Sequence, residues 1–166
     1  MATALFISRT DLVKNTLIDG NVDTSKFIQY IKIAQEMHIQ KYLGTKLYNR
    51  ISNDIISNTL SGDYLSLVND YLQPMLIHYA MMDYLPFAAY QIKNGGVFKH
   101  NSENSETVSK DEIDFLTKKQ RDFAEYYTRR FIDYICFNST KFPEYNNNTE
   151  TDIYPDKNTN SSNWVL

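Results

Sequence analysis

The chain has 166 residues, of which 42% are hydrophobic and 22% are charged, and its formal net charge is −3. This composition is typical of a globular protein with one domain, or with one domain and an appendage. The acidic balance disfavours nucleic-acid binding through bulk positive charge, and the single cysteine, Cys136, excludes an internal disulfide.

The N-terminal sequence MATALFISRTD contains an apolar run that is too short for a signal peptide. No stretch approaches the roughly 18 apolar residues of a transmembrane helix, so we expect no membrane partner. Cys136 lies in the helical pattern FIDYICFN and is predicted to be a small buried hydrophobic residue. A lone cysteine is typical of a reducing compartment, or of an extracellular particle that is assembled in one.

In chain order, the first predicted element is a short extended apolar stretch at residues 4–7. Ser8 and Asp11 then form a weak capping signature for a short helix around residues 10–15. The sequence IDGNVDTS that follows is rich in turn-forming residues, and it separates this short helix from the body of the chain.

Two longer helices are predicted next. The periodicity of apolar residues indicates a helix from about Thr24 to Tyr42, with Gly44 as its stop. A second helix begins near Thr45 and ends at the turn sequence NTLSGD, and its apolar residues recur at helical spacing.

The third helical segment is predicted to run from Asp63 to Asn94. Pro74 suits the first position of a new helix or a kink in a continuous one. The sequence MLIHYAMMDYLPFAAYQI is apolar nearly all round, which predicts the central buried helix. Pro86 is expected to kink it, and NGG at residues 94–96 to end it. Residues 97–108 read as a polar loop whose role stays open.

The fourth helix has the clearest signals. Ser109 and Glu112 form a capping box, and the apolar period continues to about Thr140. Glu125, Arg129 and Asp133 are spaced as i,i+4 ion pairs on its outer face.

These elements predict an all-α protein. A bundle of about four helices forms a domain at residues 1–145, and an extended C-terminal tail follows at residues 146–166. From Asn146 onward the composition changes to Asn, Thr, Asp and Ser, which buries too little apolar area to order itself. The tail nevertheless ends on Val165, Leu166 and the only tryptophan, Trp164. We interpret this ending as a docking hook on a polar tether.

No pattern indicates catalysis, a cofactor or a metal. The three histidines, His38, His78 and His100, each lack a second ligand three or four residues away. The glycine pair in NGG lacks the phosphate-loop pattern, and no serine lies in a nucleophile elbow. We therefore expect no catalytic, cofactor-binding or metal-binding residues, and the protein is not expected to be an enzyme.

Two features leave alternatives open. Basic residues on the fourth helix could contact phosphates, but acidic neighbours between them favour ion pairing; the basic residues are Lys118, Lys119, Arg121, Arg129 and Arg130. Thirteen tyrosines and nine phenylalanines indicate either interaction surfaces or a tyrosine-rich core whose hydroxyl groups reach water.

Four segments, in order, resemble the head-to-tail connector proteins of tailed bacteriophages, most closely those of crAss-like phages of Bacteroidetes. They are IQKYLGTKLYNRI, YLQPMLIHYAMMDYLPFAAYQIKNGGV, NSENSETV and EYYTRRFIDYICFNSTKFPEY. The resemblance covers about residues 5–145. It implies a helical-bundle portal adaptor, a structural virion protein that forms a ring beneath the portal, joins the capsid portal to the tail and lines the DNA exit channel.

The resemblance also implies partners and a location. The partners are the phage portal protein, neighbouring connector or tail ring proteins, and further copies of the chain in a homo-oligomeric ring, expected to be a dodecamer. Genomic DNA would pass through the lumen without sequence-specific binding. The protein would reside in the virion after assembly in the bacterial host cytoplasm.

In similar adaptors the C-terminal segment docks on the portal. By analogy, the expected docking residues are Ile153, Tyr154, Trp164, Val165 and Leu166. The tail lies outside the resembling region, and it could instead bind another ring or a neighbouring subunit. The alternative function is a small helical nucleic-acid-binding regulatory protein, in which residues 118–130 would contact the nucleic acid.

Overall fold

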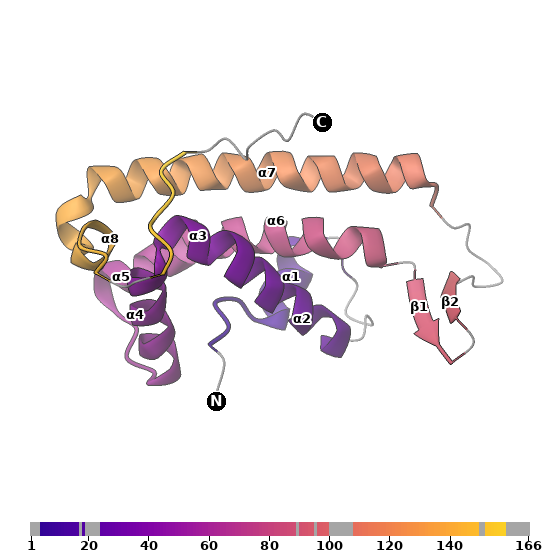
Figure 1. Cartoon of the computed structure of the whole chain (residues 1–166), viewed down its shortest axis with the longest axis horizontal. Helices are drawn as coiled ribbons and strands as arrows, with labels where there is room; N and C mark the ends of the chain where they lie inside the picture. The colour runs from indigo at the N-terminus through magenta and orange to yellow at the C-terminus, as the bar shows by residue number, and fades with distance from the viewer. Residues whose placement is uncertain are drawn as a thin grey trace.

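The computed structural model of the chain describes residues 4–16, 18, 24–88, 90–94, 96–99, 108–149 and 152–158. Over these ranges the fold is all-α, as predicted, apart from one β-hairpin that was not predicted. Figure 1 shows a long helix, α7, along one edge of the molecule, α6 beside it, and the N-terminal helices on the other side of α6.

The N-terminal segment enters the core before the first helix begins. Ala4, Phe6 and Ile7 are buried, and the short helix α1 (Arg9–Asn15) starts after Ser8. Ser8 and the side chain of Asp11 form the predicted capping box, which confirms this local signal.

The first long helix is also confirmed, although it is not α-helical throughout. It comprises α2 (Thr24–Ala34), a π-helical turn η1 (Gln35–Ile39) and α3 (Gln40–Leu43). Gly44 ends it with a φ of 74°, a conformation that glycine adopts without steric cost. Helix α4 (Thr45–Ile56) then begins directly.

The predicted central helix is confirmed in the core. A rod formed by α5 (Gly62–Leu67), the π-turn η2 (Val68–Leu72) and α6 (Gln73–Tyr84) crosses the molecule, with Pro74 in the first turn of α6. Helix α6 packs between α2 and α7. Residues all round α6 are buried: Met75, Leu76, Ile77, Tyr79, Ala80 and Met81.

The prediction that this helix reaches Asn94 is wrong. It ends in the 3₁₀ turn η3 (Leu85–Phe87), because Pro86 lacks the amide hydrogen that a continuing helix needs. The chain then forms an antiparallel hairpin of β1 (Tyr90–Lys93) and β2 (Gly96–Lys99), in which Tyr90 pairs with Lys99. Part of the expected polar loop is therefore a strand, and residues 100–107 lie outside the described residues.

Helix α7 (Lys110–Phe137) has 28 residues, so it is about 42 Å long. The predicted capping box at its start, made by Ser109 and Glu112, is confirmed. Its buried face packs on α6 through Ala124, Thr128, Phe131, Ile132 and Ile135. Cys136 was expected to be buried, but it is exposed, because the helix turns it away from its buried neighbour Ile135.

After α7 the chain folds back with the 3₁₀ turn η4 (Ser139–Lys141) and the short helix α8 (Pro143–Asn146). Phe142 and Tyr145 are buried, so this return belongs to the core. Among the helices of the described residues, none combines the length and apolar character that a membrane span requires.

Candidate interaction surfaces

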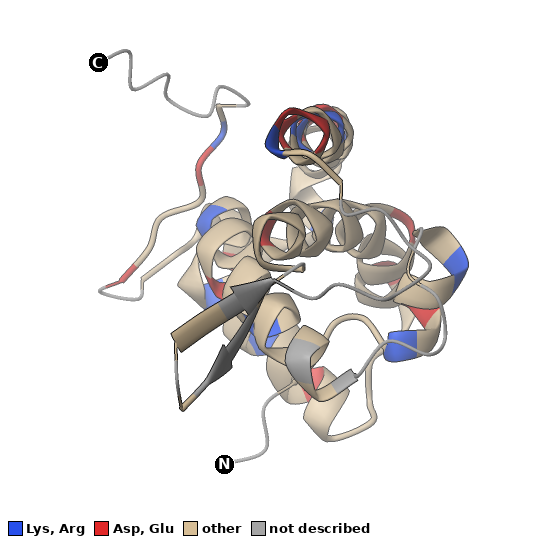
Figure 2. Cartoon of the chain, turned by 90° about the vertical axis from the view of Figure 1, so that its right-hand side faces the viewer, with Lys and Arg blue, Asp and Glu red and all other residues tan. Residues whose placement is uncertain are grey.

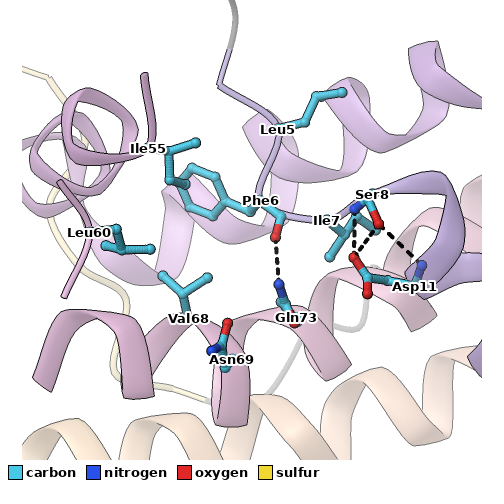
Figure 3. A pocket seen from close by; sticks show the side chains of 10 residues that line it. All are labelled: Leu5, Phe6, Ile7, Ser8, Asp11, Ile55, Leu60, Val68, Asn69 and Gln73. Atoms are coloured by element: carbon cyan, nitrogen blue, oxygen red, sulfur yellow. Dashed lines mark hydrogen bonds between the residues drawn. The ribbon is translucent and has the colours of Figure 1, made fainter. Parts of the chain in front are cut away.

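An open pocket of about 400 Å³ lies where the N-terminal segment meets α4, η2 and the start of α6. Figure 3 shows its apolar wall, which includes Phe6, Ile55 and Val68, and the polar side chains of Ser8, Asp11 and Gln73. Gln73 donates a hydrogen bond to the carbonyl of Phe6 at 3.1 Å, and Asp11 accepts from the amide and hydroxyl of Ser8. The polar groups of this pocket thus hold the N-terminal segment in place.

Two histidines are held by neighbours inside the fold. Nε2 of His38 lies 3.2 Å from Oδ2 of Asp83, and the His38 ring stacks on Tyr79 with ring centroids 4.0 Å apart. His78 lies 2.7 Å from Oε1 of Gln120 and stacks on Tyr127. Burial lowers the pKa of His78.

These contacts make both histidines packing residues rather than parts of a shared site. Within the described part of the chain, no group of three His, Cys, Asp or Glu side chains could hold a metal ion. His100 lies outside the described residues.

The C-terminal segment lies against the bundle. We call residues 147–149 and 152–158 the strap; in Figure 1 it leaves α8 and runs past α3. The Ile153 carbonyl accepts a hydrogen bond from the Thr45 amide at 3.0 Å, and the Asp156 amide donates to the Lys41 carbonyl at 3.0 Å. The prediction that the chain after Asn146 cannot order itself is therefore wrong for the strap.

The strap satisfies backbone groups that the ends of two helices leave free. The Thr45 amide belongs to the first turn of α4, and the Lys41 carbonyl to the last turn of α3, so neither has a partner within its own helix. The strap supplies an acceptor to one and a donor to the other. Its order depends on hydrogen bonds with polar backbone rather than on burial of a large apolar area.

Side chains reinforce this contact. Oγ1 of Thr45 donates to Asp152 at 3.0 Å and accepts from the Ile153 amide at 3.1 Å. Nζ of Lys41 lies 3.3 Å from Oδ2 of Asp156. Pro155 packs so closely on Gly44 that a Cβ built there would lie 2.7 Å from the proline ring. Position 44 therefore favours glycine for two reasons: its φ is positive, and Pro155 approaches it too closely for a side chain.

The expected docking residues fall into two groups. Ile153 is half-buried, with its amide and carbonyl bonded to Thr45, whereas Tyr154 is 72% exposed. Trp164, Val165 and Leu166 lie outside the described residues.

A second exposed surface follows the outer side of α7. Phe115, Tyr126 and Phe137 are 59%, 64% and 91% exposed, which is unusual for aromatic side chains on a helix whose other face is in the core. The sequence left the surplus aromatics open between interaction surfaces and a tyrosine-rich core, and it did not single out Phe115 or Phe137. Their regular spacing of 11 residues was the available signal.

The basic residues of α7 lie on the same helix among acidic ones. Figure 2 views α7 end-on and shows both signs of charge on its exposed turns. The guanidinium of Arg130 lies 5.1 Å from the ring centroid of Tyr71, and Nζ of Lys119 lies 5.8 Å from that of Phe115. The expected ion pair between Arg129 and Asp133 is not among the ion pairs of the described residues. The described surface of α7 is mixed in charge rather than a basic stripe.

A model of a family of unknown function, DUF6712, matches residues 39–155, well over half of the chain. The chain belongs to the DUF6712 family. The DUF6712 match runs from the end of η1 to Pro155, so it includes the α3–α4 turn and the strap residues Asp152, Ile153 and Pro155, and it stops just before Asp156. The match ends before Trp164. Comparisons with curated proteins and with solved structures gave no match.

Proposed function

We propose that this protein is a structural ring subunit of a phage head-to-tail connector, which joins the portal to the tail and encloses the DNA exit channel. The resemblance of four segments in the same order supports this assignment, and an all-α bundle is the body that such an adaptor needs. The observation that carries the proposal is the strap, because its hydrogen bonds hold Ile153 and Asp156 on the α3–α4 turn and so set where the proposed hook begins.

The strap sets how far the proposed hook can reach. Eight residues follow Asn158, and an extended chain covers at most about 3.5 Å per residue. Leu166 can therefore reach about 28 Å from the end of the strap. On this proposal, the docking site on the portal lies within about 28 Å of Asn158 in the assembled particle.

The strap also lowers the entropic cost of docking. Burial of Trp164 and Leu166 contributes about 2–3 kcal/mol each, and ordering a flexible residue costs about 1 kcal/mol or more. Because hydrogen bonds already hold the strap on the bundle, the proposal counts this ordering cost for residues 159–166 and not for the strap. The two side chains still do not offset that cost, so backbone hydrogen bonds to the partner must contribute.

Repetition in a ring strengthens such a contact. Each subunit offers one hook, and once one hook has bound, the others are held near their sites at high effective concentration. The acidic net charge of −3 suits a channel through which DNA slides, because repulsion prevents the phosphates from being held.

The test is a mass measurement by light scattering on the protein alone, on the portal protein of the same phage, and on their mixture. We expect small species from the protein alone and a defined ring complex with the portal. The proposal fails if the mixture shows only the separate components. Salt-dependent binding to DNA fragments in that case would support the regulatory alternative.

A further inference from the structure

The exposed face of α7 carries aromatic and charged residues that are placed symmetrically about Tyr126. Residues at equal distances before and after Tyr126 are both aromatic or have opposite charges. The aromatic residues Phe115, Tyr126 and Phe137 are evenly spaced by 11 residues. Between the first two lie Lys119 and then Asp122. Between the second two lie Arg130 and then Asp133, in the mirrored positions.

All seven residues lie on one side of the helix. At 100° per residue they fall within an arc of about 80°, and all are exposed. The buried residues of α7, such as Ala124 and Phe131, fall on the opposite side. An 11-residue spacing returns a side chain to nearly the same direction after three turns, so the pattern forms a straight stripe about 33 Å long. Figure 1 shows α6 along one side of α7, and the buried residues of α7 pack against α6.

We propose that this stripe pairs with the stripe of a second copy of the chain, with the two α7 helices antiparallel. A two-fold axis at Tyr126 places the tyrosine opposite its symmetry mate, and each Phe115 opposite Phe137 of the other copy. Lys119 then faces Asp133, and Asp122 faces Arg130. Each opposite-charge contact occurs twice, as an isologous interface requires.

The charge order selects this orientation over a parallel one. In a parallel, in-register pair, each charged residue would face the same residue of the other chain, so that lysine faces lysine at position 119 and aspartate faces aspartate at position 133. A parallel shift of 11 residues does no better, because it places Lys119 opposite Arg130 and Asp122 opposite Asp133. Like charges in direct contact disfavour both arrangements.

The pairing should be reversible. The stripe is a single helix face, smaller than most stable dimer interfaces, and its ion pairs are exposed. The guanidinium of Arg130 lies 5.1 Å from the Tyr71 ring centroid, and Arg130 remains exposed. We therefore expect a dimer that forms as concentration rises, independently of any role in a connector.

Sedimentation velocity on the full chain, from about 1 to about 200 µM, tests the pairing by charge reversal. Lys119→Asp and Asp133→Lys should each weaken self-association about tenfold or more, because two-fold symmetry places two like-charge contacts in the dimer. The double variant Lys119→Asp/Asp133→Lys should restore it. An equimolar mixture of the two single variants should also form dimers, because each reversed charge then meets its opposite.

Lys118→Asp is the matched control, since this exposed lysine points 100° away from Lys119 and should leave association unchanged. The proposal is overturned if the wild type stays monomeric over this range, or if the double variant and the mixture associate no better than the single variants.

Spin labels test the orientation in a Cys136→Ser background. A label at position 126 should give a short distance between copies, and a label at position 115 a distance of about 33 Å. Short distances at both positions would overturn the antiparallel arrangement.

Discussion

The amide of Thr45 donates a hydrogen bond to the carbonyl of Ile153 at 3.0 Å, and the amide of Ile153 donates to Oγ1 of Thr45 at 3.1 Å. These residues are 108 positions apart in the sequence, so the contact closes the chain from the α3–α4 turn to the strap. It fixes the place from which the C-terminal residues begin, and this placement is the basis of the proposed docking role.

The first prediction concerns Gly44. Gly44→Ala should destabilise the protein, because φ is +74° and the new Cβ would clash with Pro155. Gly62→Ala is the matched control, since φ is +58° there but nothing lies within 4 Å of the added Cβ. The control should lose about 1 kcal/mol from backbone strain alone, and Gly44→Ala more.

Urea unfolding measures both losses, and hydrogen exchange at the Asp156 amide reports on the strap. Exchange should be faster in Gly44→Ala only. Equal losses and equal exchange in the two variants would show that the Pro155 contact contributes nothing.

The second prediction concerns Gln35, which is 1% exposed. Its side chain accepts from the amide of Phe6 at 3.0 Å and donates to the carbonyl of Ala4 at 2.8 Å. Gln35→Met should cost about 2–4 kcal/mol, because two buried backbone groups lose their partners. Gln73→Met, which removes one half-buried bond to Phe6, should cost about 1 kcal/mol. Comparable unfolding free energies for the two variants would contradict this account of the N-terminal segment.

The third prediction concerns the central helix. Leu76 is completely buried in α6, so Leu76→Ala should leave a cavity and cost about 2–5 kcal/mol. Leu85 lies in η3 and is only partly buried, so Leu85→Ala should cost less. Thermal and urea unfolding give both values. If the Leu85 variant is the less stable of the two, the core is centred differently from the structure described.

The fourth prediction is a pH dependence. Burial lowers the pKa of His78 below its usual value of 6.5, so the folded protein binds this proton less readily than the unfolded chain does. The resulting stability is present above pH 6.5 and is lost as the pH falls below it. His78→Phe keeps an aromatic ring beside Tyr127 and removes the titration. Urea unfolding between about pH 7.5 and pH 5 should show a smaller loss of stability in the variant than in the wild type. An equal loss of stability in His78→Phe and in the wild type would contradict this prediction.

Local signals in the sequence predicted the elements that depend on neighbouring residues. The capping boxes at Ser8 and Ser109, the stop at Gly44 and the all-round apolar pattern of α6 each determine structure within a few residues. The all-α class follows from these signals alone. The π-turns at Gln35–Ile39 and Val68–Leu72 were not predicted, because their apolar spacing matches that of an ordinary helix.

Features that depend on distant contacts were missed. The strap is polar in composition, and its order comes from helix-end groups of Lys41 and Thr45 that no local pattern reveals. The hairpin after Pro86 was read as helix because Tyr90 and Ile92 continue an apolar run. Cys136 is exposed because of the way α7 is rotated against α6. The apolar residues beside Cys136 in the sequence do not determine this rotation.

The central claim, docking of the C-terminal residues on the portal, is tested most directly by co-sedimentation with purified portal protein. The samples are the full chain, a chain that ends at Asn158, and Trp164→Ala. The truncation keeps the strap, so the bundle should stay folded, as circular dichroism would confirm. We expect the full chain to sediment with the portal, the truncated chain to stay in solution, and Trp164→Ala to bind more weakly. Equal sedimentation of the truncated and full chains would contradict the claim.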